Sequence, residues 1–245
     1  MQMQTQIKIE NLTKKFKTSK GTITALDNIS LEIFKGQTLI IGGQNGSGKS
    51  LLVSILAGLE KASSGSIKIA DKAGLGLVFQ EAESQILGES PAEDIAFGPK
   101  NLGWKKEEIS AAVKDALEKT GLTEKADFPA RFLSGGEKRR LAIACMLAMK
   151  LPVLILDEPY ANLDYSGIKS LNALIRQLKK EGHTIIILTH EIEKCLGLAD
   201  RFIVLFKGKK VFDGSPDQGL KQPLEEWNIR NPLVSYKAVE DLVWE

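Results

Sequence analysis

The sequence contains little cysteine and no long apolar run. Its 245 residues include two cysteines, Cys145 and Cys195, and each lies in an apolar stretch typical of a helix. Two distant thiols do not form a disulfide framework, so we expect both to be free core residues in a reducing compartment. No apolar segment approaches the roughly 20 residues that span a bilayer, so a membrane role would depend on a partner.

The sequence also lacks an excess of charge of either sign. Lys and Arg total 33 and Asp and Glu total 31, which leaves a net charge of +2 and no general attraction to nucleic acid. Residues 1–6 contain neither a basic nor an apolar segment, so we expect no signal peptide. The hydrophobic fraction of 43% is sufficient for one large domain or two small ones.

What the sequence does contain is a phosphate-binding loop at residues 43–50, GQNGSGKS. It matches the pattern G-x-x-x-x-G-K-[ST], follows an apolar run typical of a buried strand, and precedes a helical pattern. Its glycines let backbone N–H groups surround an anion, and the following helix adds its positive end. We expect Lys49 to reach the terminal phosphates and Ser50 to hold Mg²⁺.

Two alternating segments at residues 7–12 and 23–33 predict strands of an antiparallel layer, joined by a polar loop at residues 17–21. Phe16 lies just before this loop. It either stacks on a nucleobase or closes the hydrophobic edge of the layer, and its surroundings in the sequence favour neither.

Two adjacent carboxylates, Asp157 and Glu158, follow an apolar run at residues 153–156 that is typical of a strand buried on both faces. Such a pair is costly unless it is paired or binds a metal. We expect Asp157 to share Mg²⁺ with Ser50. Glu158 should point the other way along the strand and polarise a water molecule.

Gln80 and His190 also follow predicted strands, at residues 75–79 and 184–188. Ligands of open α/β sheets bind at the carboxyl ends of strands. Gln80 is therefore a candidate for contact with Mg²⁺ or the attacking water, although a lone glutamine there is usually only solvated. His190 is a candidate for contact with a γ-phosphate, the alternative being a structural role.

Residues 88–133 predict a helical insertion into the α/β core, since apolar residues recur at helical spacing and Gly121 follows as a helix stop. Acidic residues gather near its start: Glu81, Glu83, Glu89, Glu93 and Asp94. They form either a solvated face or a docking surface for a basic partner.

Residues 133–137, LSGGE, open a further predicted helix. Ser134 and Glu137 have the spacing of a capping box. That motif does not explain Gly135 and Gly136, each of which costs roughly 1 kcal/mol relative to alanine inside a helix. Bare N–H groups at a helix start suit a phosphate, so this is a second candidate anion site.

The last third of the sequence predicts a helix at residues 165–181 and two strands, 202–206 and 210–212, around Gly208. Beyond residue 215 the pattern is less regular. A short amphipathic end is predicted to form a tail helix (Val239, Leu242, Val243 and Trp244).

Taken in order, these motifs resemble those of the ATP-binding cassette (ABC) family: residues 43–50, Gln80, residues 133–137, 154–158 and 162–164, and His190. The resemblance covers about residues 7–215. It implies an α/β fold, a P-loop NTPase (RecA-like) core with an antiparallel β subdomain and an inserted α-helical subdomain. It divides the chain into an ABC ATPase domain at residues 1–220, with the helical subdomain at about 88–133, and a C-terminal extension at 221–245.

The resemblance also implies ATP and Mg²⁺ as ligands and a second ABC ATPase subunit as partner, in a homo- or heterodimer. The two subunits would pair head to tail, so that ATP held by Lys49 of one chain meets Ser134 and the two glycines of the other. Phe16 stands where the family has an aromatic that stacks on adenine. The implied nucleotide-binding residues are Phe16, Gly43, Gln44, Asn45, Gly46, Ser47, Gly48, Lys49, Ser50, Leu51, Ser134, Gly135, Gly136 and Asp164. The implied catalytic residues are Glu158, His190 and Gln80, and the implied metal ligands are Ser50, Gln80 and Asp157.

A finer likeness is carried by FQEAESQI and EDIAFGPKNLG within residues 79–103, which resemble the ATPase subunits of energy-coupling factor (ECF) transporters. It implies ATP hydrolysis at the cytoplasmic face of the cell membrane that powers uptake of a vitamin or a transition-metal ion. The partners would be a transmembrane coupling subunit, whose basic helix motifs meet Glu81 and Glu83, and a substrate-binding membrane subunit.

Two other functions remain open for the sequence. One is an ATPase subunit of another ABC importer or an exporter. The other is a soluble ABC ATPase that acts on nucleic acid, against which the single phosphate loop and the nearly neutral charge argue, so we expect no direct nucleic-acid contact. Three positions depart from the usual family pattern: Glu137 stands where Gln is usual, Tyr160 where Thr is common, and Asn162 where Gly or Ala is more usual.

Overall fold

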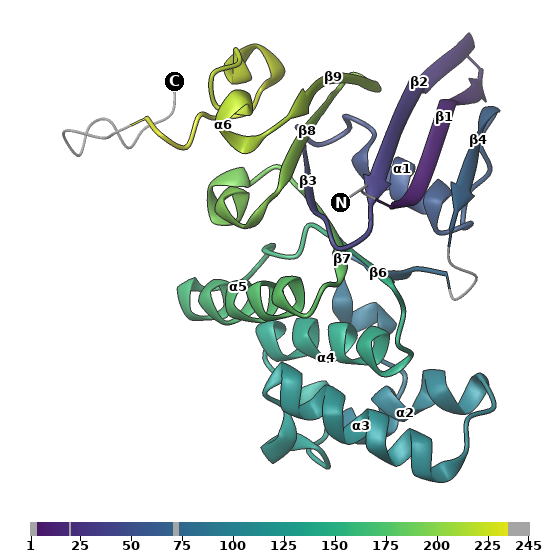
Figure 1. Cartoon of the computed structure of the whole chain (residues 1–245), viewed down its shortest axis with the longest axis vertical. Helices are drawn as coiled ribbons and strands as arrows, with labels where there is room; N and C mark the ends of the chain where they lie inside the picture. Colours follow the sequence, from purple (N-terminus) through teal and green to yellow (C-terminus); the bar gives the residue numbers. More distant parts are fainter. Residues whose placement is uncertain (1–3, 20, 71–73, 235–245) are drawn as a thin grey trace.

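A computed structural model describes residues 4–19, 21–70 and 74–234. Two β-sheets and a group of helices make up the chain (Figure 1). A three-stranded sheet lies at one end of the molecule, helices α2 (Pro91–Asn101) and α3 (Lys106–Thr120) lie at the other, and a six-stranded sheet lies between them. This confirms the predicted α/β fold with an antiparallel part and a helical part.

The six-stranded sheet carries the strand ends at which the sequence predicts a site. Its strand order is β5-β6-β7-β3-β8-β9. The strands are β3 (Thr38–Gly42), β5 (Gly76–Val78), β6 (Val153–Asp157), β7 (Thr184–Thr189), β8 (Arg201–Phe206) and β9 (Lys209–Gly214). Neighbouring strands are parallel, except that β9 runs antiparallel to β8. Every residue of β3, β6 and β7 is buried, as the continuous apolar runs predict.

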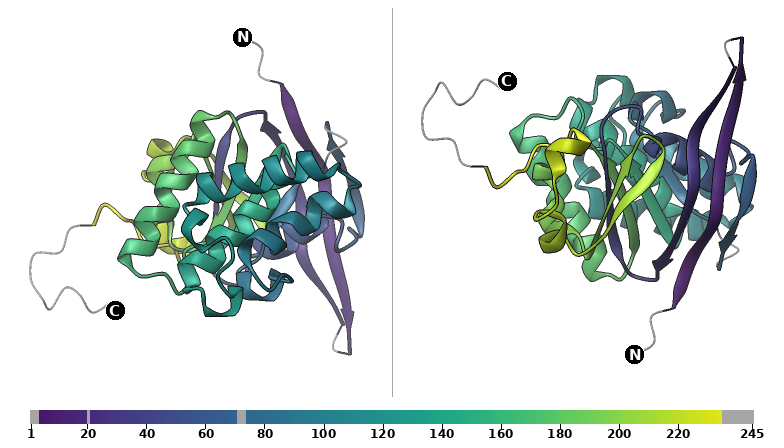
Figure 2. Two further views of the ribbon diagram at one scale, coloured as in Figure 1. Left: turned by 90° about the horizontal axis from the view of Figure 1, so that it is seen from below. Right: turned by 90° about the horizontal axis from the view of Figure 1, so that it is seen from above.

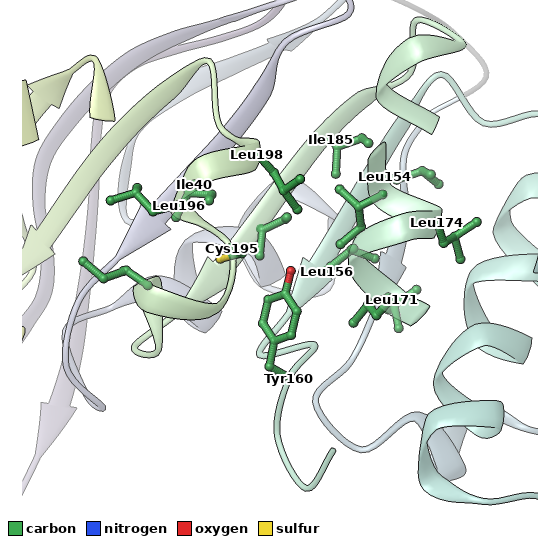
Figure 3. Packing of buried hydrophobic residues seen from close by; sticks show 14 of the residues in the cluster. Ile40, Leu154, Leu156, Tyr160, Leu171, Leu174, Ile185, Cys195, Leu196 and Leu198 are labelled. Carbon is green, nitrogen blue, oxygen red and sulfur yellow. The ribbon is translucent and has the colours of Figure 1, made fainter. Parts of the chain in front are cut away.

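Alternate side chains of these strands pack into two cores on opposite faces of the sheet. On one face, Leu39 and Ile41 pack with α1 (Lys49–Leu56) and the three-stranded sheet. On the other face, Leu154 and Leu156 pack with α4 (Gly135–Ala148) and α5 (Tyr165–Lys180). Figure 3 shows part of the second core, into which the ring of Tyr160 points. Packing on both faces therefore holds the strand ends in place.

The three-stranded sheet confirms the predicted antiparallel layer but has longer strands than predicted. It contains β1 (Thr5–Thr18), β2 (Gly21–Phe34) and β4 (Ser64–Ile69), with β1 in the middle. Thr18 pairs with Gly21, so residues 17–18, predicted as loop, belong to the strand. Their polar side chains are exposed, and a solvent-facing ribbon keeps its backbone ladder without apolar residues.

The segment predicted as a helical insertion, residues 88–133, contains α2 and α3, and α4, which follows it, packs against both. Ser90 caps the start of α2, and Gly121, at φ 66°, ends α3 in the left-handed conformation. These helices bury a small core of their own, which includes Ile95, Leu117 and Leu141. Helix α4 contributes to this core and to the core of the central sheet, so it joins the two parts.

The C-terminal segment packs against the central six-stranded sheet, on the side away from the three-stranded sheet (Figure 2). It contains α6 (Pro216–Gly219), and Leu224 and Ile229 are each only 2% exposed. The 3-10 helices of the described chain are η1 (Ala82–Gln85), η2 (Thr123–Lys125), η3 (Ala130–Phe132), η4 (Ile192–Lys194), η5 (Leu196–Leu198) and η6 (Leu224–Trp227). The predicted tail helix at Val239–Trp244 lies outside the described residues.

In the part of the chain that the structure describes, no helix has both the length and the apolar character needed to cross a bilayer. Cys145 and Cys195 are both free thiols, as expected from the sequence.

Candidate active site

The phosphate loop connects β3 to α1, and two of its glycines, Gly43 and Gly48, have a positive φ and close neighbours. Gly43 has φ 153°, and a Cβ atom there would lie 2.4 Å from the Leu205 carbonyl oxygen. Gly48 has φ 105°, and a Cβ atom there would lie 2.6 Å from Leu26 Cδ2. A side chain at Gly43 would require the backbone of β8 to move, and one at Gly48 would require at least the Leu26 side chain to move, in a backbone conformation that favours glycine. The loop is therefore pressed between β8 on one side and β2 on the other.

Lys49 lies folded over this loop and is only 5% exposed. Its Nζ donates to the carbonyl oxygens of Gly43 at 2.6 Å and Gln44 at 3.2 Å. The same Nζ is 3.3 Å from Glu158 Oε1, and Glu158 Oε2 is 3.0 Å from His190 Nδ1. The fold thus brings Lys49, Glu158 and His190, which are far apart in the sequence, into one cluster at the edge of the sheet.

Glu158 reaches this cluster in a different way from the one predicted. Strand β6 ends at Asp157, and Glu158 has φ 44°, in the left-handed region. Its N–H donates to the Leu188 carbonyl oxygen at 2.8 Å. The expectation that strand alternation directs Glu158 is therefore wrong, because a left-handed turn directs it instead. A non-glycine residue in this conformation is strained by roughly 1–3 kcal/mol, and such strain concentrates at functional sites.

Asp157 supplies a buried carboxylate next to the loop. It is 7% exposed, and its Oδ1 has no hydrogen-bond partner among the described residues. Burial raises the pKa of Asp157 above its usual value, although the nearby Ser50 hydroxyl opposes this effect and the Glu158 charge adds to it. Carboxylate and hydroxyl oxygens are ligands that Mg²⁺ prefers, so Asp157 and Ser50 fit the predicted metal site.

The LSGGE segment forms the capping box that its spacing predicts. Ser134 Oγ accepts from the Glu137 N–H at 3.3 Å, and the Ser134 N–H donates to Glu137 Oε2 at 2.8 Å. The other oxygen of Glu137 forms an ion pair with Lys125 Nζ at 2.5 Å. A glutamine would keep the capping bond but lose the ion pair, which gives glutamate a local reason to stand at position 137.

Gly135 and Gly136 differ from the glycines of the phosphate loop. A Cβ atom on Gly135 would meet its nearest neighbour at 4.0 Å, and one on Gly136 at 3.8 Å, which are ordinary van der Waals distances. Neither residue has a positive φ. The fold of the single chain therefore does not require glycine at either position.

A pocket of about 340 Å³ lies beside this helix start. Ser134, Gly136, Asn162 and Asp164 are among its lining residues. Asp164 caps α5 by accepting from the Gly167 N–H at 2.7 Å, and Asn162 has φ 59°, which explains why a residue tolerant of the left-handed region stands there. The starts of α4 and α5 thus open onto one hollow.

Comparison with known proteins decides the family. The family model described as ABC transporter matches residues 26–161, more than half of the chain. The chain belongs to the ABC transporter family. It is therefore an ABC ATPase, the ATP-binding and ATP-hydrolysing subunit of a transporter, as the ordered motifs predict.

Similar proteins have related names. The energy-coupling factor transporter ATP-binding protein EcfA2 of Clostridium perfringens is 43% identical, with 94% of this chain and 87% of the relative covered. EcfA2 of Clostridium tetani is 41% identical, with coverage of 94% and 86%.

Two solved structures resemble this ABC ATPase closely. CbiO1 of Clostridium perfringens, described as part of the ABC transporter complex cbiONQ, superposes with a TM-score of 0.81 at 35% identity, covering 94% of this chain and 96% of CbiO1. The ATP-binding cassette MJ0796, solved as a dimer bound to ADP and Pi, superposes with a TM-score of 0.75 at 27% identity, covering 86% and 98%.

Gln80 of the ABC ATPase lies just past the end of β5 and is exposed. It lines a pocket of about 380 Å³ together with Gly135, Arg139 and Asn162. The structure therefore places Gln80 between the sheet edge and the start of α4. Its predicted contact with Mg²⁺ or the attacking water stays a prediction.

Arg139 is a residue of this region that the sequence interpretation missed. It is 5% exposed, and its guanidinium donates to the Phe79 carbonyl oxygen at 2.8 Å and, at 3.5 Å, to that of Ala161. It thus ties α4 to the strand end before Gln80 and to the turn after β6. The available signal was its spacing, since Arg139 lies four residues before the buried Ile143 and so on the inward face of the helix.

Phe16 remains a candidate for adenine stacking. It lies near the end of β1, is 39% exposed, and has Lys14 Nζ 4.8 Å from its ring centroid. A lysine near the ring stabilises it through a cation–π contact. The exposure leaves part of the ring free to stack on another planar group, and the predicted adenine contact stays a prediction.

The acidic residues near the helical insertion do not act as one group. Asp94 is 4% exposed, and its Oδ1 accepts from the N–H groups of Leu87 and Gly88 at 2.7 and 2.8 Å. The assignment of Asp94 to a solvated or docking face is therefore wrong, because its buried carboxylate accepts hydrogen bonds from the backbone that precedes α2. Glu83 stays 75% exposed while pairing with Lys138 Nζ at 2.6 Å.

Proposed function

We propose that this ABC ATPase is the energy-coupling subunit of an ECF-type importer, and that ATP hydrolysis by it powers uptake of a vitamin or a transition-metal ion. The cluster of Lys49, Glu158 and His190 carries the hydrolytic part of the proposal, together with the neighbouring Asp157, whose Oδ1 has no hydrogen-bond partner among the described residues. The relatives named EcfA2, at 43% and 41% identity, support the ECF type.

The phosphate loop is proposed to hold the triphosphate through its N–H groups and Lys49. Ser50 and Asp157 would hold Mg²⁺, with Gln80 as a further ligand, and the ion would supply charge neutralisation at the phosphates. Glu158 orients the attacking water and accepts its proton as general base. His190 binds and stabilises the γ-phosphate. The 3.0 Å contact between Glu158 Oε2 and His190 Nδ1 fixes the positions of these two side chains relative to each other.

A second ABC ATPase subunit is proposed to complete the site. The start of α4 would seal ATP that is held by the other chain. Support comes from Gly135 and Gly136, which the single chain does not need as glycines, and from the dimeric structure of the similar cassette MJ0796. Their bare N–H groups suit a phosphate that approaches from outside the chain.

The membrane partners are proposed to be a transmembrane coupling subunit and a substrate-binding subunit. The ATPase would then be a peripheral protein at the cytoplasmic face of the membrane. The similar protein CbiO1 supports this proposal, since it is part of the ABC transporter complex cbiONQ. The exposed carboxylates of Glu81 and Glu83 give further support, because they suit a basic element of a partner.

Replacement of Glu158 tests the hydrolytic role. We expect Glu158→Gln to bind ATP and to remain dimeric with it, while turnover falls by about 100-fold or more because the general base is lost. ATP binding, phosphate release and sedimentation velocity measure the three properties. The exposed Glu193→Gln, close in sequence to His190, is a matched control that should retain turnover. Normal phosphate release by Glu158→Gln would refute the assigned role.

A further inference from the structure

The C-terminal segment touches the phosphate loop. Asn228 Nδ2 donates to Gln44 Oε1 at 2.7 Å, across 184 residues of sequence. Gln44 is the second residue of the GQNGSGKS loop, whereas Asn228 follows η6 in the extension that the sequence interpretation left without a role. The contact therefore links the extension to the loop that is proposed to hold the triphosphate.

The backbone that carries Asn228 is firmly held. Leu224 and Ile229, on either side of it, are each 2% exposed and pack in the same core as Phe202 and Val204 of β8. The Ile229 N–H donates to the Leu224 carbonyl oxygen at 2.9 Å and closes the turn. Asn228 itself has φ 55°, a conformation that asparagine tolerates better than most residues. The exposed amide of Asn228 therefore extends from a backbone that is held in place by its packed neighbours.

On the other side of the contact, the backbone of Gln44 takes part in the loop. Its carbonyl oxygen accepts from the Ser47 N–H at 3.1 Å and from Lys49 Nζ at 3.2 Å. The rear of the loop is held separately, since the Gly208 N–H donates to the Ser47 carbonyl oxygen at 3.0 Å. Holding the Gln44 side chain therefore restrains the part of the loop that lies beside the lysine.

We infer that Asn228 is a positioning residue for the phosphate loop, that it acts through Gln44, and that the C-terminal segment is thereby part of the ATP site. The inference rests on the proposed role of the loop in ATP binding. An ordered loop binds substrate and transition state alike. Loss of the contact should therefore raise the KM for ATP and the Kd for nucleotide and leave kcat unchanged.

Asn228→Gly removes the amide without straining the backbone, because glycine adopts a positive φ freely. Loss of one such hydrogen bond should raise the Kd for MgADP and the KM for ATP by about three- to tenfold. Calorimetry measures the Kd, and steady-state kinetics measure the KM. The unfolding temperature without nucleotide and kcat should stay unchanged. Asn28→Gly is the matched control, since Asn28 is an exposed asparagine at φ 52° in the three-stranded sheet.

A double-mutant cycle tests the route through Gln44. Gln44→Ala should raise the same Kd and KM, and combining it with Asn228→Gly should add little, because both remove one contact. Additive effects, unchanged nucleotide binding in Asn228→Gly, or a fall in its unfolding temperature would each overturn the inference.

Lys49→Ala separates this inference from the proposed function. Loss of nucleotide binding in Lys49→Ala together with normal binding in Asn228→Gly would refute only the role of Asn228. Normal binding in Lys49→Ala would refute the role of the loop itself.

Discussion

Asp157 shows, for a single residue, the conflict between stability and function in this site. Its carboxylate is buried beside Glu158, one of its oxygens has no partner among the described residues, and burial raises its pKa. A raised pKa in the folded state means that the ionised form lowers stability at neutral pH. A residue with this cost is typical of a site whose partner is a ligand.

Asp157→Asn should therefore stabilise the nucleotide-free protein while it impairs Mg²⁺-dependent nucleotide binding. The unfolding temperature at pH 7 should rise, by roughly 2–4 °C for each kcal/mol of charge burial that is relieved. The gain should shrink as the pH falls toward about 4, because the wild-type carboxyl is then protonated and its cost disappears. Scanning calorimetry across this pH range measures the effect.

The control for Asp157→Asn is Asp127→Asn, at an exposed position. It should change neither the unfolding temperature nor the gain in ADP affinity that Mg²⁺ provides. A lower unfolding temperature for Asp157→Asn at pH 7 would show that the carboxylate is paired rather than unsatisfied.

Among the elements, η1 is the one that the proposal places against a membrane partner. It follows Gln80 closely, and the Glu83–Lys138 ion pair joins it to α4. An exposed ion pair of this kind adds at most about 1 kcal/mol to stability. Its acidic residues can therefore be exchanged without loss of the fold.

Glu81→Lys combined with Glu83→Lys should release the transmembrane partner, because like charges would face its basic element. We expect the double variant to keep its basal ATP turnover and to fail to co-purify with the transmembrane subunits from solubilised membranes. Asp115→Lys with Glu118→Lys, on the exposed face of α3, is the charge-matched control. Retained co-purification would show that Glu81 and Glu83 form only a solvated face.

On the scale of the whole molecule, the glycines of the phosphate loop and those at the start of α4 differ in what requires them: the fold of the single chain or a partner subunit. Gly43 and Gly48 of the phosphate loop are needed by the single chain, since both have a positive φ and Cβ atoms there would lie too close to Leu205 of β8 and Leu26 of β2. Gly136 has ordinary clearance within the chain. A requirement for glycine at position 136 would therefore arise from a molecule outside this chain, such as a partner subunit and its nucleotide.

Gly136→Ala should accordingly leave the monomer as stable as before, or more stable by up to about 1 kcal/mol, because alanine favours helix. ATP-dependent dimerisation and turnover should fall, since the added methyl group occupies the surface that is proposed to seal the partner's ATP. Urea unfolding, sedimentation velocity with ATP and phosphate release measure these three properties. Unchanged dimerisation and turnover would contradict the proposed sandwich.

Much of the fold could be predicted from the sequence, because it depends on local patterns. Continuous apolar runs predicted the buried strands β6 and β7, and glycine with a following lysine and serine predicted the loop before α1. The polar end of β1 was predicted as loop, since polarity alone does not reveal that Thr18 pairs with Gly21. Pairing between strands depends on neighbours that the local pattern does not contain.

The site shows the same division more sharply. By itself, the sequence determined which side chains stand at strand ends and helix starts, because those positions follow from periodicity and capping. Only the tertiary structure decided the left-handed turn that directs Glu158, the burial of Asp94, and the contact of Asn228 with Gln44. The physical reason is that burial and long-range hydrogen bonds are set by segments brought together in space, and no local pattern records which segments these are.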